Sequence, residues 1–188
     1  MPTGTFTKDN YNTVKDAIKD IENVRTVFET SEDSGAELTD DFEPTSLTPL
    51  LRDSKKLYNH IITKTRAVAK ARFEALGQGE NFHFLDVTLK ENTYTDVSRT
   101  QNTIYQRLNY EKPSGTVVNV RKSMWIHPTI NRAVSIREAA RLQTFPDSFV
   151  FCGTKDSQYQ QVGNAVPPIL AKAIAEHLAS YLDQKKNG

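Results

Sequence analysis

Regularly spaced apolar residues predict three helices in this chain. The first is a short amphipathic helix over Val14–Val24, and the second is a longer helix over Leu50–Leu76 that stops at Gly77. The third begins at Pro167-Pro168, because proline suits the first turn of a helix, and runs to about Leu182. Its apolar residues fall along one face at Leu170, Ile174, Leu178, Tyr181 and Leu182. Such a stripe predicts that the last helix is buried against another surface.

A fourth helix is indicated by the S-x-x-E pattern of Ser135 and Glu138, which is typical of a capping box. We expect a short helix that begins just after Ser135 and ends before Pro146. Arg137 and Arg141 would share one face of it, because they are four residues apart. On this local pattern alone, the segment is an ordinary surface helix with two basic side chains.

The remaining segments differ in character. Residues 29–49 are acidic, rich in Ser and Thr and interrupted by proline, which indicates a surface excursion or a flexible insert. Between residues 82 and 134, short runs at 102–108 and 115–120 have the composition of strands and turns. The pattern predicts an α+β fold, a small mixed domain of irregular strands with flanking helices. We expect three parts, at residues 1–49, 50–134 and 135–188.

The charge of the chain is divided unevenly. The whole sequence has a net charge of +1, which by itself argues weakly against a nucleic-acid binder. Residues 1–50 contain four Lys/Arg against eleven Asp/Glu (net −7), whereas residues 51–188 contain twenty against twelve (net +8). A DNA-binding surface would lie in the basic part, although a solvated surface of mixed charge explains the same numbers.

Several classes of protein are disfavoured by composition. The single cysteine, Cys152, excludes an internal disulfide and a cysteine-rich zinc site, and fits a reducing, cytoplasmic setting. The four histidines share no common spacing, so we expect no metal site. No apolar run is long enough to span a membrane, and the first ten residues lack the apolar stretch of a signal peptide.

Two strings in the last third of the chain carry a family resemblance. Ser135–Phe149 reads S-I-R-E-A-A-R-L-Q-T-F-P-D-S-F, and Gln161–Pro168 reads Q-V-G-N-A-V-P-P. In this order and at this separation, they resemble the ninth and tenth motifs of the DNA (cytosine-5) methyltransferases. The resemblance extends over about residues 13–183 and is strongest from Tyr105 onward. It implies a target-recognition domain followed by a helix that packs on an α/β catalytic domain absent from this chain.

The tenth motif implies a cofactor contact. A Gly-Asn pair just before a helix N-terminus offers backbone N–H groups and a side-chain amide, which suit a carboxylate. In the family, this motif lines the pocket for the methionine end of S-adenosylmethionine. The resemblance therefore implies that Asn164 and Ala165 contact S-adenosylmethionine and that Gly163 permits its close approach, in a pocket that this chain supplies only in part.

The resemblance also implies DNA contacts. Lys112–Val118 is similar to the region whose landmark is a Thr followed by Leu or Val, so Thr116 would donate to a phosphate near the target cytosine. Basic and amide side chains nearby can read base edges and hold phosphates, although a twisted sheet with polar faces explains them equally. The candidate DNA-binding residues are Thr116, Arg99, Gln101, Asn102, Arg121, Lys122, Arg137 and Arg141.

The motifs that carry out the chemistry of the family are missing. The sequence has no F-x-G-x-G first motif, no Pro-Cys loop and no Q-R-R-like eighth motif. Cys152 follows the ninth motif, in the wrong place for the nucleophile, and is expected to be a semi-buried packing residue. Glu22-Asn23-Val24 matches the sixth motif by sequence, but Thr13–Ile18 before it resembles a lead-in that follows the eighth motif. We expect no catalytic residue in this chain.

The sequence thus indicates the DNA-recognition part of a bacterial restriction-modification methyltransferase, either a natural small subunit or a piece of a longer enzyme. Its partners would be duplex DNA and a catalytic methyltransferase domain or subunit. Alone, it is expected to be inactive, and either to self-associate through its last helix or to fold that helix onto its own body. Two alternatives stay open: a non-enzymatic DNA-binding or regulatory module, and an independent enzyme that uses Cys152.

Overall fold

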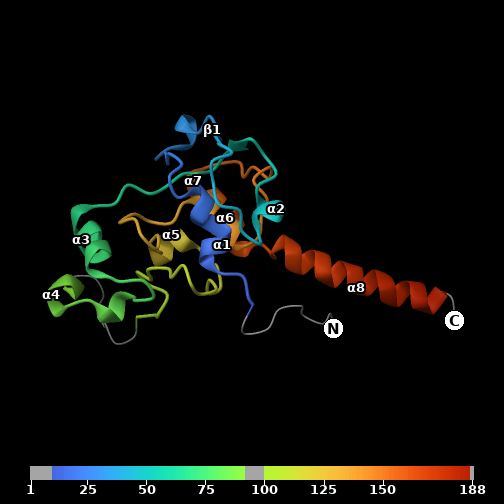
Figure 1. The fold of residues 1–188 in the computed structure, drawn as a ribbon. Helices are drawn as coiled ribbons and strands as arrows, with labels where there is room; N and C mark the ends of the chain where they lie inside the picture. Colours follow the sequence, from blue (N-terminus) through green and yellow to red (C-terminus); the bar gives the residue numbers. More distant parts are fainter. Residues whose placement is uncertain (1–9, 92–99, 187–188) are drawn as a thin grey trace.

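The computed structural model of the chain describes residues 10–91 and 100–186 (Figure 1). It is a mixture of short helices and one small sheet. In chain order the elements are α1 (Val14–Ile18), η1 (Lys19–Ile21), η2 (Thr30–Glu32), β1 (Ala36–Glu37), α2 (Thr48–Leu51), β2 (Lys56–Leu57), α3 (Ala67–Ala75), η3 (Phe82–Phe84), α4 (Val87–Lys90), α5 (Val120–Ser123), α6 (Ile136–Leu142), α7 (Lys155–Asn164) and α8 (Pro168–Lys186). The strands β1 and β2 are antiparallel, with Ala36 opposite Leu57 and Glu37 opposite Lys56.

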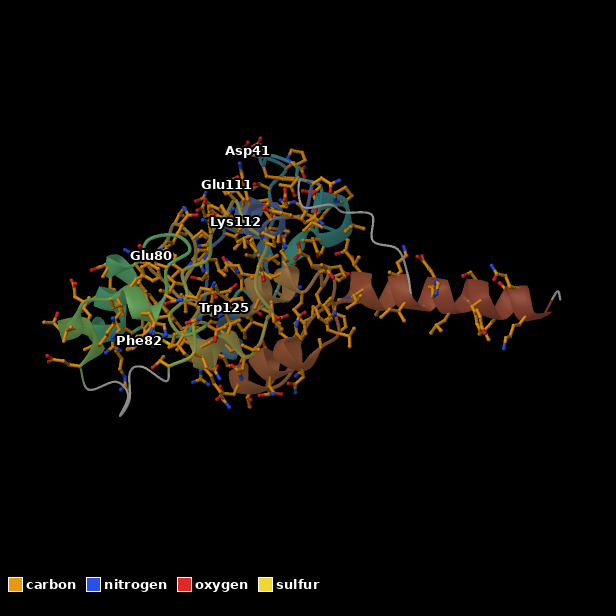
Figure 2. The ribbon with its side chains drawn as sticks, turned by 90° about the horizontal axis from the view of Figure 1, so that it is seen from below. Asp41, Glu80, Phe82, Glu111, Lys112 and Trp125 are labelled. Atoms are coloured by element: carbon orange, nitrogen blue, oxygen red, sulfur yellow. The ribbon has the colours of Figure 1, made fainter. Side chains whose placement is uncertain are left out.

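The larger of two apolar cores joins both ends of the sequence. Helix α1 packs on α6, and α6 on α7, so that Ile18 and Ala139 belong to the same buried cluster. Trp125 lies in this cluster with no exposed surface, in the middle of the body in Figure 2. The first helix therefore shares one core with the C-terminal helices α6 and α7 rather than forming a separate unit.

A smaller core supports a second lobe around α3 and α4, at the left of Figure 1. Phe73, Phe82 and Tyr105 are its buried aromatic residues, and the rings of Phe73 and Tyr105 meet edge to face at 6.0 Å. Ile126 belongs to this core while its neighbour Trp125 belongs to the larger one, so the chain passes between the two cores at this point. The division of the sequence at residues 49 and 134 stays a prediction.

The expected helix over Val14–Val24 is present in shortened form. Thr13 caps α1 through a capping box with Asp16, and the 3-10 turn η1 continues it to Ile21. The acidic stretch that follows lies at the surface: Leu47 is the one buried residue between positions 29 and 49.

The expected long helix over Leu50–Leu76 is wrong. Its first two residues end α2, and beyond them only its last third is helical, as α3, which ends at Ala75. Upstream, Asn59 has a left-handed backbone (φ 63°), and its N–H donates to Asp33 Oδ2 at 2.6 Å. The carbonyls of Asn59 and Ile61 accept from the first two N–H groups of α6. The buried residues of this segment thus lie in an extended strand-like path, because hydrogen bonds to distant segments replace those within a helix.

The strands expected over residues 102–108 and 115–120 are also wrong. The described part of this region contains isolated β-bridges at Arg107, Ile126 and Ala133. It contains no β-ladder of two or more residue pairs. The buried guanidinium of Arg107 connects backbone segments that no sheet joins. It donates to the carbonyls of Leu76 at 2.7 Å and His127 at 2.8 Å. A single side chain therefore ties together backbone segments that a sheet would otherwise join.

The two C-terminal helices are confirmed. Ser135 and Glu138 form the predicted capping box of α6, and α8 begins at Pro168 as expected. Helix α8 extends away from the body in both views (Figures 1 and 2). Its stripe is open to solvent, with Leu170 50% exposed and Leu178 54% exposed. Across the described residues, no helix has the length and apolar character needed to cross a membrane.

Candidate DNA and cofactor site

The structure brings the predicted cofactor segment and the predicted DNA segment to one hollow of about 510 Å³. Thr116 lies on one wall of it, and Gly163 and Ala165 lie on another. Gln143 and Thr144, which follow α6, complete the floor. Residues that are 47 positions apart in sequence, Thr116 and Gly163, thus share one concave surface at the base of α8.

Gly163 and Asn164 lie shortly before the start of α8, as expected, but they are also the last two residues of α7, a helix that was not expected. This helix was missed, although Thr154 as N-cap and the buried pair Tyr159 and Val162 were available signals. Asn164 is exposed, and its Oδ1 accepts from Gln160 Nε2 at 2.8 Å. Contact of Gly163, Asn164 and Ala165 with S-adenosylmethionine stays a prediction.

A close contact with the protein's own backbone explains why position 163 is glycine, which the sequence alone did not reveal. A Cβ built on it would lie 2.9 Å from the carbonyl carbon of Val118 and 3.0 Å from the backbone nitrogen of Asn119. The close approach that this glycine permits is therefore made by the protein's own backbone. That Gly163 also permits close approach of the cofactor stays a prediction.

The expectation that Arg137 and Arg141 bind DNA is wrong in this structure, because both side chains are buried. Arg137 donates to the carbonyls of Tyr58, Pro146 and Phe149, at 2.8, 3.0 and 2.7 Å. Burial lowers the pKa of this guanidinium to about 10. Its donors hold three chain segments together, so none is directed to a ligand outside the protein.

Arg141 is the centre of a buried ion network. Its Nε and Nη2 donate to Asp147 at 2.9 and 2.5 Å, and its Nη1 donates to Asp20 at 2.5 Å. Asp20 also accepts from Arg52 at 2.9 Å. Although burial lowers the pKa of Arg141, the two carboxylates raise it overall. The ninth motif is therefore held by charge to Asp20 in η1 and, through Asp20, to Arg52 just after α2.

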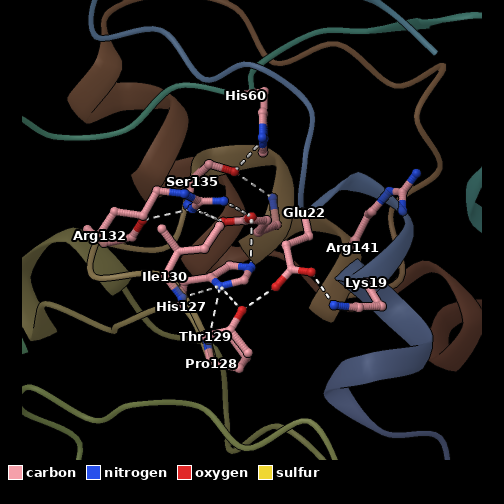
Figure 3. A network of polar contacts seen from close by, with 12 residues as sticks. Lys19, Glu22, His60, His127, Pro128, Thr129, Ile130, Arg132, Ser135 and Arg141 are labelled. Atoms are coloured by element: carbon pink, nitrogen blue, oxygen red, sulfur yellow. Dashed lines mark hydrogen bonds and ion pairs between the residues drawn. The ribbon is translucent and has the colours of Figure 1, made fainter. Parts of the chain in front are cut away.

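A second buried network contains His60, His127, Arg132 and Ser135 (Figure 3), and the last three of these contact Glu138. Burial raises the pKa of this carboxyl, but the hydrogen bonds and charge of Arg132 outweigh burial and lower it to about 2. His60 Nδ1 lies 3.0 Å from Ser135 Oγ, and His127 Nε2 lies 3.6 Å from Glu138 Oε1. Burial lowers the pKa of both histidines to about 4. Both rings are therefore neutral at pH 7, and the network serves packing.

The remaining DNA candidates lie at the surface or outside the described residues. Thr116, Gln101, Asn102 and Lys122 are exposed. Arg121 is half-buried and forms an ion pair with Asp156 of α7. The position of Arg99 lies outside the described residues. DNA contacts of these residues stay a prediction.

A second, basic hollow lies in the smaller lobe. Its volume is about 700 Å³, and Lys64, Arg66 and Arg72 line it together with Tyr105 and Met124. Both Tyr105 (φ 51°) and Met124 (φ 55°) have left-handed backbones, an unfavourable conformation for residues with a side chain. Because Met124 ends α5, this hollow adjoins the helix that carries Arg121 and Lys122.

The rejected catalytic candidates occupy other places. Cys152 is exposed, which corrects the expectation of a semi-buried packing residue. Glu22 accepts hydrogen bonds from Tyr110 Oη at 3.1 Å and also from Lys19 and Thr129. Its carboxylate therefore contacts these three side chains and does not orient a catalytic cysteine. Among the described residues, no cluster of His, Cys, Asp and Glu could hold a metal ion.

Comparison with known proteins decides the family. The profile of the family described as C-5 cytosine-specific DNA methylase matches residues 2–180. This chain belongs to that family. Type II methyltransferase M.DdeI from Desulfomicrobium norvegicum is 33% identical over 144 residues, which are 70% of this chain and 35% of that protein. The chain therefore spans well under half the length of M.DdeI.

Two further comparisons show how much of each known protein this chain matches. Type II methyltransferase M.AquIB from Picosynechococcus sp. is 40% identical over 106 residues, which are 48% of this chain and 76% of that protein. M.AquIB is thus itself shorter than this chain. A crystal structure from E. coli, described as a DNA modification methyltransferase encoded within a prophage, has a TM-score of 0.67 at 24% identity. The match covers 93% of this chain and 48% of that one, which shows a shared fold.

Proposed function

We propose that this member of the cytosine-5 methyltransferase family supplies DNA recognition and one wall of the cofactor pocket to a catalytic part that another chain or segment provides. The observation that carries the proposal is the continuity of the hollow with α8. Gly163 and Ala165 line the hollow, and three residues later α8 leaves the body with an exposed apolar stripe. A methyltransferase catalytic domain is the partner that would cover this stripe.

The residues fit one wall of an S-adenosylmethionine pocket. Gly163 and Ala165 line the hollow, and Asn164, the exposed residue between them in sequence, ends α7. A carboxamide can donate a hydrogen bond to the carboxylate of the methionine end of the cofactor. When bound, S-adenosylmethionine would supply the methyl group for C5 of cytosine in duplex DNA. On this chain, Asn164 and Ala165 would bind and orient it.

The short relative M.AquIB supports a separate subunit. A type II methyltransferase polypeptide shorter than this one shows that a member of comparable extent exists. The sequence has no Pro-Cys loop, so the nucleophile that attacks an extruded cytosine would come from the partner. Restriction-modification is the biological setting that the type II relatives suggest for this chain.

Methyl transfer in trans tests the proposal. Purified chain, S-adenosylmethionine and a duplex of mixed sequence should give no methyl incorporation. M.DdeI from which the matched region is deleted should be equally inactive, and adding this chain should restore tritiated methyl incorporation into cytosine. Incorporation by this chain alone would contradict the proposal and favour an enzyme based on Cys152. Binding of DNA without any restoration would favour the non-enzymatic module instead.

Self-association of the free chain is a further expectation. Leu170, Ile174 and Leu178 expose about half of their surface each along α8, at 50%, 42% and 54%. An apolar stripe of this size in water favours association. Sedimentation velocity should show an oligomer whose share rises with protein concentration. The triple variant L170Q/I174Q/L178Q should sediment as a monomer, and a monomeric wild-type chain at all concentrations would refute the expectation.

A further inference from the structure

Helix α7 makes three separate contacts with the segment that would bind DNA. The backbone at Gly163 touches the backbone of Val118 and Asn119 so closely that a Cβ would overlap with it. Asn119 Nδ2 donates to Gln160 Oε1 at 3.4 Å. The third contact is the ion pair between Asp156 of α7 and Arg121 of α5. These contacts are spread along the helix, from its first turn to its last.

One of these contacts, between Asn119 and Gln160, belongs to a chain of hydrogen-bonded side-chain amides. Gln160 accepts from Asn119 through Oε1 and donates through Nε2 to Asn164 Oδ1 at 2.8 Å. Asn119 in turn caps α5, because its side chain accepts from the N–H of Lys122 at 3.3 Å. A continuous path of hydrogen bonds therefore leads from the candidate cofactor residue Asn164 to the helix that carries the candidate DNA residues.

We propose that Gly163 and Gln160 are positioning residues: they fix the DNA-contacting segment 116–122 against the helix that ends in the cofactor residue Asn164. Gly163 sets the distance between the backbone of α7 and that of residues 118 and 119. Gln160 sets their register through the two hydrogen bonds of its side-chain amide. Val120 and Val162, 2% and 1% exposed, lie in the same core and support the contact from beneath. This inference rests on the proposed function of the segment in DNA recognition.

The distance can be altered with one methyl group. In G163A, the new Cβ meets backbone atoms, which cannot rotate away, so residues 118 and 119 must move by several tenths of an ångström. A matched control is G115A, because Gly115 lies in the same segment and a Cβ there meets nothing within 4 Å. Gln160 is exposed, so Q160A tests the register with little effect on folding.

The experiment combines backbone amide chemical shifts with the affinity of the full chain for a 30-base-pair duplex of mixed sequence, measured by fluorescence anisotropy. In G163A, shifts should be concentrated at residues 116–122, and the dissociation constant should rise about threefold to tenfold. Q160A should change in the same direction by less, about twofold to threefold, while its unfolding free energy stays that of the wild type. G115A should match the wild type in all three measurements.

Each result separates the inference from the proposed function. Wild-type affinity of G163A and Q160A, without shifts at residues 118 and 119, would overturn the positioning role. Equal losses in G163A and G115A would overturn it as well, because any methyl group in the region would then suffice. If the wild-type chain does not bind the duplex, the proposed DNA function fails, and the amide shifts alone decide whether α7 fixes the segment.

Discussion

Replacement of Arg141 by methionine should lower the free energy of unfolding by about 3–5 kcal/mol, the usual cost of removing one partner of a buried ion pair. Asp147 has no exposed surface and would lose both of its close contacts to the guanidinium. Asp20, whose side chain is 4% exposed, would keep only Arg52. A buried carboxylate would remain whose nearest cation is then Arg137, at 4.0 Å. Urea denaturation at pH 7.5 measures the loss.

Methionine is the matched replacement here because it retains most of the side-chain volume without a charge. A control at an exposed pair is K172M, since Lys172 and Glu176 are 74% and 67% exposed. That change should cost no more than about 0.5 kcal/mol. The double variant R141M/D147N should recover part of the loss, because it removes the stranded charge. Equal stability of R141M and K172M would show that the network contributes nothing to the fold.

Stability should fall steeply on mild acidification. Burial lowers the pKa of His60 and His127 to about 4, so between pH 6.5 and 4 the unfolded chain binds protons that the folded chain does not. The free energy of unfolding is therefore highest above pH 6.5 and falls as the pH is lowered. From pH 7.5 to pH 5 we expect a loss of about 3–4 kcal/mol from the two histidines together.

Glu138 extends the loss to lower pH. Its folded pKa of about 2 lies below its ordinary value of 4.5, so its contribution is complete above pH 4.5 and disappears as the pH falls toward 2. Urea denaturation at pH 7.5, 6, 5, 4, 3 and 2 covers both the histidine and the Glu138 range. H60Q/H127Q should flatten the profile between pH 7.5 and 5. A flat wild-type profile would contradict the burial of both rings.

Predictions from the sequence succeeded where the determining contacts are local. Ser135 and Glu138 lie three residues apart and cap the same helix turn, so their pattern alone defines the start of α6. The stripe of α8 is likewise a property of one segment. Thr154 with Tyr159 and Val162 formed a local signal of the same kind for α7, and it was missed because the Gly-Asn pair was interpreted only as the approach to the helix at Pro167-Pro168.

The failures have a common physical cause in long-range partners. The helical spacing of Leu57 and Ile61 is genuine, but the N–H of Asn59 donates to Asp33, 26 positions earlier, and its Oδ1 accepts from the N–H of Phe151, 92 positions later. No local rule contains those partners. Arg137 has the spacing of a surface residue, and only the three-dimensional arrangement shows that three carbonyls surround its guanidinium.

The candidate site was predicted in part. Motif resemblance identified Thr116, Gly163 and Ala165, which line one hollow, and Asn164, which does not line it. Resemblance could not show that Gly163 is required by the backbone of Val118, because the contact depends on how α7 lies against a loop 45 residues away in sequence. The sequence pattern also does not distinguish exposed arginines, which can bind a ligand, from buried arginines, which stabilise the fold.

Helix α8 has a mechanical consequence as well. Its 19 residues make a rod about 28 Å long at 1.5 Å per residue. The rod is attached through the short connection Val166-Pro167, and the Ile169 N–H donates to Thr144 Oγ1 at 3.3 Å near its base. A rotation of about 10° at this connection would carry the far end of the helix through about 5 Å, the pitch of one helical turn. Two consecutive prolines restrict that rotation, because proline fixes the backbone angle φ. The direction of α8 therefore depends on the stiffness of this connection.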